Sequence, residues 1–277
     1  IPIVITVHES ITPSLLVDDA PAFAGYYINA INTLLDITAD ILVFLSTDAK
    51  DRFRGWTSTS DRCHIPHGVP SKSVSLSQDE AKEQLGYNPE TPLIVEAGYI
   101  EPRKGSHLVV DVAQELPEYN FLLAGELTDN GEYNNRITKS QPQNVEITGL
   151  LDEKQLEAAF IAADCVILPY IEFERKYFIN KVNQSGIFNL SAIYGCPTVA
   201  SNCSYFEGIR EEWGCLLTAP PVPDSLAQSI QTIIRDSSKR EELKGRLTEF
   251  CEENKMEKIG RSYESIYMSI SKSGIPR

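Results

Sequence analysis

The sequence lacks long hydrophobic runs, clustered cysteines and an excess of basic residues. None of its apolar stretches approaches the ~20 residues that a membrane-spanning helix needs. Its 25 Lys and Arg residues against 39 Asp and Glu residues give a net charge of −14, which argues against sequence-independent binding to nucleic acid or to anionic lipid. Internal repeats and low-complexity tracts are missing too. These absences argue against a membrane-spanning helix and a repeat architecture within the given residues and disfavour a nucleic-acid-binding protein.

The six cysteines are scattered and include no Cys-x-x-Cys pair. Several lie in or beside apolar, strand-like segments, where a free cysteine behaves as a small hydrophobic residue. This distribution predicts a reduced, cytoplasmic protein without structural zinc.

The 277 residues are enough for about two domains, and short β-branched runs alternate with longer amphipathic ones. Such alternation is typical of βαβ units and predicts an α/β protein with parallel sheets. Ser77 with Glu80 and Ser238 with Glu241 have the spacing of helix capping boxes. We expect strands at residues 3–7, 41–45, 63–65, 93–97, 120–124, 145–148, 165–168 and 198–201.

The most informative segment is residues 98–105 (GYIEPRKG), which lies between a predicted strand and a predicted helix beginning near Ser106. Parallel α/β sheets bind ligands at such crossings, outside the carboxyl ends of their strands. Here Arg103 and Lys104 are flanked by two glycines, and two fixed cations suit a doubly charged phosphate. The alternative interpretation is an ordinary solvated turn with two surface cations.

Residues 183–186 (NQSG) open another predicted helix. The backbone N–H groups of Ser185 and Gly186 would point from its N-terminus towards an anion, which is a favourable position for phosphate. An ordinary Ser/Gly helix start is the alternative.

A series of short motifs runs along the chain in a fixed order: residues 4–8 (VITVH), 65–69 (IPHGV), 98–105, 121–125 (FLLAG), 145–149 (VEITG), 162–170 (AADCVILPY) and 195–201 (GCPTVAS). Through these motifs most of the chain resembles the retaining glycosyltransferases of family 4, which have the GT-B fold. The resemblance implies two Rossmann-like domains whose parallel sheets face a cleft. Residues 1–70 would be the remaining part of the N-terminal, acceptor-side domain, and residues 71–256 the nucleotide-sugar-binding domain. Residues 257–277 would form a closing helix that could pack back on the first domain.

The resemblance implies three catalytic residues. Lys104 and Arg103 match a basic pair that grips the donor pyrophosphate and stabilises the leaving group, a task that positive side chains must perform where no metal does. His8, at the end of its strand, would reach the sugar or the acceptor, although it could instead cap a nearby carbonyl. The implied donor-binding positions are Gly98, Tyr99, Gly149, Leu150, Asn183, Ser185, Gly186, Ser191 and Glu207.

Some of these positions depart from the family pattern. Tyr99 stands where the family often has arginine, and Arg103 is the expected substitute. Asn183 and Ser191 stand where many members have two glutamates, so neither supplies a carboxylate. Gly149 and Leu150 match the loop that reads the nucleobase, and Glu207 matches an acidic position of the donor pocket, with a solvated glutamate as the alternative.

Two further segments lie outside the pattern. The insertion at residues 171–181 is either an acceptor loop or a partner contact. The resemblance starts late in the first domain, and the chain begins at Ile1 without methionine. We expect an upstream segment; the alternative is a half-enzyme completed by another copy or by a second subunit, since an unpaired sheet edge tends to associate.

The predicted function is therefore transfer of a sugar, with retention of configuration, from a UDP- or GDP-linked donor to a hydroxyl of a carbohydrate, lipid-linked or protein acceptor. The nucleotide-sugar is a co-substrate, and no cofactor or metal is expected because no Asp-x-Asp motif occurs in a suitable loop. The enzyme would act in the cytoplasm, either free or at the membrane face. The rival hypothesis is a non-catalytic nucleotide-sugar-binding or scaffold subunit. Glycoside hydrolysis is disfavoured because Glu172 and Glu174 share one loop.

Overall fold

The computed structural model describes residues 2–72, 76–128 and 130–273. They form two compact units: unit 1 contains residues 2–70, 172–185 and 253–273, and unit 2 contains the described residues of 71–171 and 186–252. Residues 172–185 and 253–256 thus belong to unit 1, whereas the sequence analysis places them in the second domain. Residues 73–75 and 274–277 of the expected domains lie outside the described residues.

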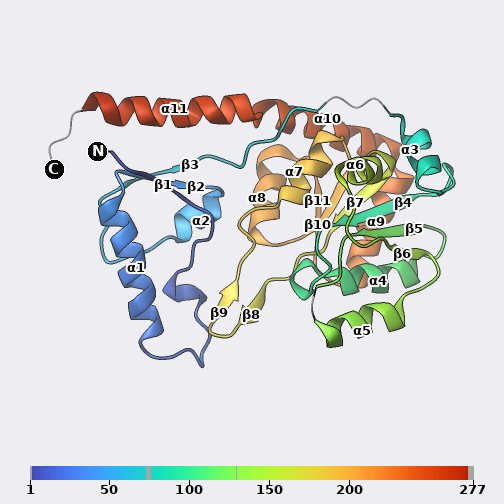
Figure 1. Cartoon of the computed structure of the whole chain (residues 1–277), viewed down its shortest axis with the longest axis horizontal. Helices are drawn as coiled ribbons and strands as arrows, with labels where there is room; N and C mark the ends of the chain where they lie inside the picture. The colour runs from blue at the N-terminus through green and yellow to red at the C-terminus, as the bar shows by residue number, and fades with distance from the viewer. Residues whose placement is uncertain (1, 73–75, 129, 274–277) are drawn as a thin grey trace. The chain divides into compact units, whose positions relative to one another are not determined.

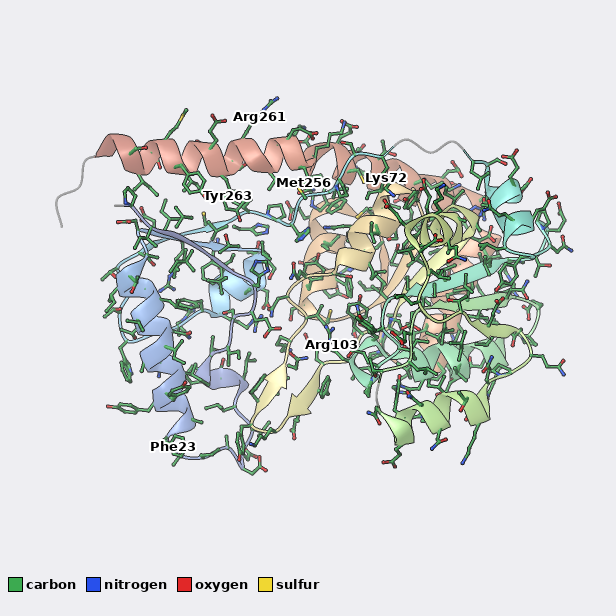
Figure 2. All side chains as sticks on the ribbon, in the orientation of Figure 1. Phe23, Lys72, Arg103, Met256, Arg261 and Tyr263 are labelled. Carbon is green, nitrogen blue, oxygen red and sulfur yellow. The ribbon has the colours of Figure 1, made fainter. Side chains whose placement is uncertain are left out.

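Unit 1 is built on a three-stranded parallel sheet of order β1-β2-β3, made of Val4–Val7, Ile41–Phe44 and Asp61–His64. Its core is formed by buried side chains that include Leu42, Phe44 and Phe53. Tyr263 points from the last helix towards the sheet, and its hydroxyl lies 3.1 Å from Thr6 Oγ1 (Figure 2). The other elements are η1 (Pro13–Leu15), α1 (Ala24–Thr38), α2 (Thr47–Arg52), the antiparallel hairpin β8 (Phe173–Arg175) and β9 (Phe178–Asn180), and α11 (Met256–Ser273), all drawn in Figure 1.

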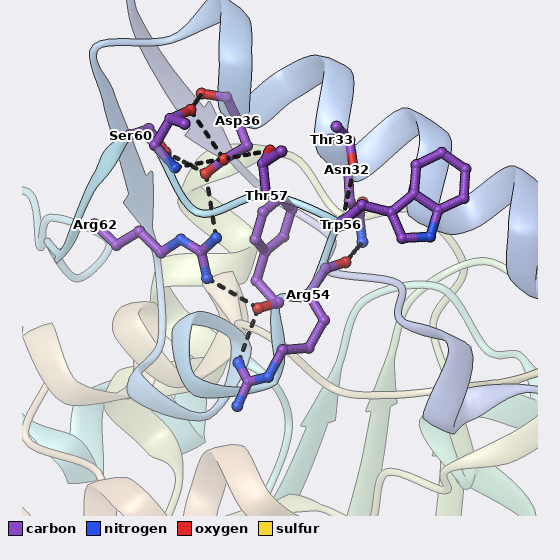
Figure 3. Close-up of polar contacts among 10 residues, drawn as sticks. Asn32, Thr33, Asp36, Arg54, Trp56, Thr57, Ser60 and Arg62 are labelled. Carbon is purple, nitrogen blue, oxygen red and sulfur yellow. Dashed lines mark hydrogen bonds and ion pairs between the residues drawn. The ribbon is translucent and has the colours of Figure 1, made fainter.

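A buried carboxylate connects α1 to the loop before β3 (Figure 3). Asp36 is 0% exposed and accepts hydrogen bonds from the Thr59 backbone N–H (2.7 Å), from three hydroxyl groups and from Arg62 Nη2 (3.2 Å). Burial by itself raises the pKa of the Asp36 carboxyl, but the bonds from Thr59, Ser60, Thr57 and Arg62 outweigh it and hold that pKa well below its ordinary value. Asp36 therefore stays charged and holds this loop on α1.

One face of α1 is apolar and exposed. Phe23, just before the helix, is 72% exposed, and Tyr27 and Leu34 are 65% and 61% exposed (Figure 2). Tyr26 packs edge-on against Trp56, with ring centroids 4.8 Å apart. Within the described part of unit 1, this face of α1 is therefore not part of the core.

Unit 2 contains a six-stranded, fully parallel sheet of order β11-β10-β7-β4-β5-β6 (Figure 1). The parallel α/β fold predicted from the alternating pattern is confirmed. In chain order the strands are β4 (Leu93–Ala97), β5 (Asn120–Ala124), β6 (Val145–Ile147), β7 (Cys165–Leu168), β10 (Thr198–Ser201) and β11 (Leu217–Ala219).

Helices connect these strands, and the main core lies where α4 and α9 pack together against the sheet. That core joins strand residues such as Ile94 and Phe121 to Val112 of α4 and Ile230 of α9. α4 also contacts α5, and α3 contacts α6. The elements are α3 (Gln78–Gln84), η2 (Pro102–Lys104), α4 (Ser106–Glu115), α5 (Gly131–Ser140), α6 (Glu153–Ala162), α7 (Gly186–Ile193), α8 (Ser204–Trp213), α9 (Pro223–Arg235) and α10 (Ser237–Glu253).

Of the two predicted capping boxes, one is confirmed and one is wrong. Ser77 and Glu80 cap α3 reciprocally, each side chain bonding the other residue's backbone N–H. Ser238, in contrast, lies inside α10, and Asp236 Oδ1 accepts the bond from Lys239 N (2.9 Å) in its place.

Among the described residues, no helix combines the length and apolar character needed to cross a bilayer.

Candidate functional site at the carboxyl edge of the unit 2 sheet

The carboxyl ends of all six parallel strands lie at one edge of the unit 2 sheet. Residues 98–105 follow β4 at this edge, residues 149–150 follow β6, and Tyr170 lies shortly after β7. Helix α7 leads into β10, so its N-terminus at Gly186 faces the same edge. The first turn of α7 adjoins the loop, because a Cβ on Gly98 would lie 3.7 Å from Ile187 Cδ1.

The loop 98–105 is anchored at both ends. Gly98 N donates to Ala124 O (3.1 Å), and a Cβ on Gly125 would lie 1.8 Å from the Gly98 carbonyl oxygen. At the other end, Gly105 has φ 73°, and a Cβ there would lie 1.9 Å from Pro169 O. Only glycine meets both the steric and the conformational requirement at position 105.

Gly105→Ala tests this anchor. We expect unit 2 to lose about 1–3 kcal/mol of unfolding free energy from the left-handed backbone alone, with the contact to Pro169 O adding to the loss. Urea unfolding measures the effect. The matched control is Gly208→Ala in α8, where a Cβ meets nothing within 4 Å, so that variant should be as stable as the native chain or slightly more stable. Equal stability of the two variants would contradict the proposed anchor.

Lys104 lies in the turn η2 and is held by an aromatic side chain from the neighbouring strand end. Its Nζ donates to the Tyr170 hydroxyl and lies 4.0 Å from the Tyr170 ring centroid. Burial and the nearby Arg103 charge lower the pKa of Lys104 to about 8, while the Glu96 and Glu101 carboxylates act in the opposite direction. The ammonium is therefore mainly charged at neutral pH.

Arg103 is more exposed, with 39% of its side chain accessible (Figure 2). Its Nη2 donates to Glu101 Oε1 (2.9 Å), and its carbonyl accepts from Ile171 N (2.9 Å). The structure thus brings Arg103 and Lys104 together in one short turn at the carboxyl edge. The phosphate-binding role of both residues stays a prediction.

The two positions at which the family pattern has glutamates already have hydrogen-bond partners. Asn183, in unit 1, is 9% exposed, and its Oδ1 accepts from Arg52 Nη2 (2.8 Å). Ser191, in α7 of unit 2, is 0% exposed, and its hydroxyl donates to Phe188 O (2.8 Å) and lies 3.1 Å from Thr198 Oγ1. Ser191 therefore lies in the core, and its donor-binding role remains untested.

The remaining predicted residues are divided between the units. His8 is exposed directly after β1 in unit 1, and Ser185 is 3% exposed and ends a unit 1 segment. In unit 2, Tyr99 and Leu150 are 59% and 77% exposed. Gly149 precedes Leu150 and its carbonyl accepts from Thr148 Oγ1 (2.9 Å).

Glu207 lies in the first turn of α8, after β10 at the same edge. Arg210 Nε donates to its Oε2 (2.9 Å). Partial burial raises the pKa of the Glu207 carboxyl, but bonds from Thr218 and Arg210 outweigh this and lower it overall. Glu207 is thus a charged, paired carboxylate at this edge.

Two residues that interact with Lys104, Glu96 and Tyr170, are not among the predicted site residues. Glu96 is 3% exposed and accepts from Ser106 Oγ (2.7 Å). A charged residue inside the otherwise apolar run 92–97 was the available signal for Glu96. Tyr170 had no comparable signal, because its contact with Lys104 joins residues 66 positions apart.

Comparison with known proteins adds sequence and structural relatives. Residues 77–249 match the family described as Glycosyl transferases group 1. The chain is 27% identical over 113 residues to the processive diacylglycerol alpha-glucosyltransferase of Acholeplasma laidlawii, covering 39% of this chain and 34% of that protein. It is 29% identical over 115 residues to the alpha-galactosylglucosyldiacylglycerol synthase of Streptococcus pneumoniae, covering 38% of this chain and 31% of that protein. The matches thus span about a third of each relative.

Solved structures resemble nearly the whole chain. Sucrose-phosphate synthase from Thermosynechococcus elongatus has a TM-score of 0.74 at 20% identity, covering 98% of this chain and 68% of that one. Anabaena HepE, solved with UDP-glucose, has a TM-score of 0.77 at 17% identity, covering 97% and 72%. At these identities the likeness establishes the fold, which is the α/β arrangement of GT-B glycosyltransferases. Because the family match includes β4 to β11 and the loop with Lys104, this chain belongs to the glycosyl transferases group 1 family.

Proposed function

We propose that the carboxyl edge of unit 2 is the donor site of a retaining, metal-independent glycosyltransferase of family 4 that uses a UDP- or GDP-sugar. The observation that carries the proposal is the position of Lys104, held on Tyr170 in a loop whose ends are anchored by glycine. Arg103 adds a second cation in the same turn, and α7 begins beside Gly98. An ammonium, a guanidinium and a helix N-terminus together suit a diphosphate.

The proposed chemistry places these groups where negative charge develops. The bond between the anomeric carbon and the diphosphate oxygen breaks, and a bond from the same carbon to the acceptor oxygen forms on the same face. The acceptor proton passes to the departing phosphate. Lys104 and Arg103 stabilise the diphosphate as it gains charge, which is the largest contribution that fixed cations can make to such a step. A role of His8, which lies in unit 1, at the sugar or the acceptor stays a prediction.

The acceptor class is proposed from the relatives. Both curated proteins carry names of glycolipid-forming enzymes, one acting on diacylglycerol. We therefore favour a lipid-linked or carbohydrate acceptor and action in the cytoplasm at a membrane face. HepE was solved with UDP-glucose, which supports testing UDP-glucose first as the donor.

One observation favours a second candidate, a non-catalytic nucleotide-sugar-binding or scaffold subunit. The Asn183 side-chain oxygen is occupied by Arg52, and Ser191 has no exposed surface. Neither residue supplies a carboxylate at the two positions where the family pattern has one.

A donor screen separates the two functions. Purified protein is incubated with UDP- and GDP-sugars and with glycolipid or oligosaccharide acceptors, and released nucleotide is measured beside calorimetric binding of UDP and GDP. We expect one donor to be turned over. Binding without release would support the subunit, and the absence of both would refute the donor site.

The same assay tests metal independence. We expect millimolar EDTA to leave the rate of nucleotide release unchanged. The cations proposed to stabilise the leaving group are side chains, which a chelator does not remove. A phosphate-transferring enzyme of known Mg²⁺ dependence, assayed in the same buffer, verifies that the chelator is effective. Loss of activity with EDTA, restored by a divalent cation, would show that side-chain cations do not suffice.

A further inference from the structure

Strand β4, which leads into the loop 98–105, contains a glutamate, Glu96, whose side chain is buried in the core. All five residues of β4 are buried, and Glu96 is 3% exposed. Side chains alternate along a strand, so Glu96 shares a face with Ile94, which belongs to the core between the sheet and α4. On this face Glu96 Oε1 accepts from Ser106 Oγ (2.7 Å), while Oε2 is buried without a partner among the described residues.

The hydrogen bond between Glu96 and Ser106 closes the base of the loop. Glu96 lies two positions before Gly98, and Ser106 directly follows Gly105 as the first residue of α4. The bond therefore joins the two chain segments that enter and leave the turn containing Lys104. Because it is fully buried, water does not compete for it, and it restricts the loop more than an exposed bond would.

The protonation of Glu96 follows from its surroundings. Burial raises the pKa of this carboxyl to about 8, with the Ser106 bond and the Lys104 charge acting in the opposite direction. At neutral pH the carboxyl is mainly protonated, because the neutral form avoids a buried negative charge next to the unpartnered Oε2. Glu96 thus combines a structural hydrogen bond with a charge that can change.

We propose that Glu96 is a positioning residue for the donor diphosphate: its buried bond to Ser106 joins the two ends of the loop 98–105 and so sets the position of Lys104 relative to the phosphate. The inference rests on the proposed function. A neutral Glu96 leaves the Lys104 ammonium fully available to phosphate. An ionised Glu96 keeps Lys104 protonated to higher pH but adds a negative charge near the phosphate position.

We expect donor binding to weaken at alkaline pH because of this pair. Glu96 ionises and Lys104 loses its proton in the same range near pH 8, and each charge favours the charged form of the other. Both changes make the loop more negative, and donor affinity falls as the pH rises through that range. Burial raises the pKa of Tyr133 to about 12 and lowers that of His107, so both are neutral near pH 8.

Other charged groups lie beside the pair. Arg103 and Glu101 are in the loop itself, and Arg136 with Asp111 lies beside His107 on the neighbouring helices. The Glu96→Gln variant separates the contribution of Glu96 to the alkaline limb from theirs.

The test compares Glu96→Gln, Glu96→Leu and Ser106→Ala across pH 6–9.5, with separate kcat and donor KM values. Glutamine keeps an acceptor for Ser106 and is always neutral, so kcat/KM at pH 7 should stay within about threefold of the native value. In the Glu96→Gln variant, kcat/KM should fall at alkaline pH in a single titration, that of Lys104. This fall should occur at lower pH than in the native protein, because no carboxylate stabilises the Lys104 charge. Glu96→Leu and Ser106→Ala should each raise the donor KM about tenfold with a smaller change in kcat.

The outcomes distinguish this inference from the proposed function. Native protein that neither binds nor turns over any nucleotide-sugar refutes the function. Native turnover with an unchanged pH profile in Glu96→Gln, or an unchanged donor KM in Ser106→Ala, refutes the positioning role alone. Thermal unfolding of each variant shows whether it still folds. If Glu96→Leu does not fold, Ser106→Ala still tests the positioning role, because it is the smaller change in the core.

Discussion

Replacing Lys104 by alanine lowers kcat/KM for sugar transfer by about 10²–10³-fold or more, because a fixed positive charge is removed from the position of the developing diphosphate. Burial makes this charge effective, since a desolvated ammonium interacts more strongly with phosphate than one in water. The contact with Tyr170 holds the ammonium at this position before the donor arrives. Steady-state kinetics with the identified donor measures the loss.

The control for this variant is Lys139→Ala, which removes an exposed cation from α5 in the same unit. Both variants should unfold at temperatures close to that of the native chain, and only Lys104→Ala should lose activity. Unchanged turnover in Lys104→Ala would refute the assignment of the donor site. A loss of turnover in both variants would point to net charge and not to this residue.

Replacing Asp36 by asparagine destabilises unit 1 by about 3–5 kcal/mol, the usual effect of removing one partner from a buried ion pair. Asparagine keeps the side-chain volume but leaves Arg62 without its carboxylate and places an amide donor against the Thr59 N–H and the surrounding hydroxyls. Urea unfolding is followed by the fluorescence of Trp56, which lies in the loop held by Asp36. Both proteins carry Trp213→Phe, because Trp213 in α8 of unit 2 would otherwise contribute to the signal. Asp51→Asn, at an exposed site in α2, should change stability by less than about 0.5 kcal/mol.

The same residue predicts a pH dependence. The folded-state pKa of Asp36 is well below its ordinary value, so its stabilisation is complete above the unfolded pKa of about 4 and is lost as the pH falls through the folded value. Native unit 1 should lose stability below about pH 4 more steeply than Asp36→Asn. If the unfolding free energies of the two proteins fell in parallel below about pH 4, Asp36 would not be the ionised group.

Local signals in the sequence predicted much of the framework. Runs of β-branched residues predicted most of the strands, because such runs are typical of buried strands. Ser77 with Glu80 predicted the start of α3, because both residues of this capping box lie within one turn. The same signal failed at Ser238, since Asp236 two residues earlier occupies the cap. The hairpin at residues 173–180 and strand β11 were not expected; both are made of three-residue strands, which give little periodic signal, and of the strands this short only β6 was expected.

The candidate site was predicted in part. The glycine-flanked cations were expected in a turn between a strand and a helix, and the structure has η2 between β4 and α4 there. Their surroundings were not expected. The sequence predicts that Asn183 binds the donor, and in the structure Arg52, 131 positions earlier, bonds its side-chain oxygen. No local pattern reports a contact of that span.

The sequence by itself determined the parallel α/β architecture, the cationic loop between its two glycines and the helix that begins at Ser106, because each depends on side-chain periodicity or on neighbours within a few residues. Only the tertiary structure decided that Tyr170 holds Lys104, that Glu96 is buried beside Ser106 and that Ser191 lies in the core. The physical reason is that burial and hydrogen bonding between distant segments follow from the order of the strands in the sheet, and the order β7-β4-β5 appears only when the whole unit is assembled.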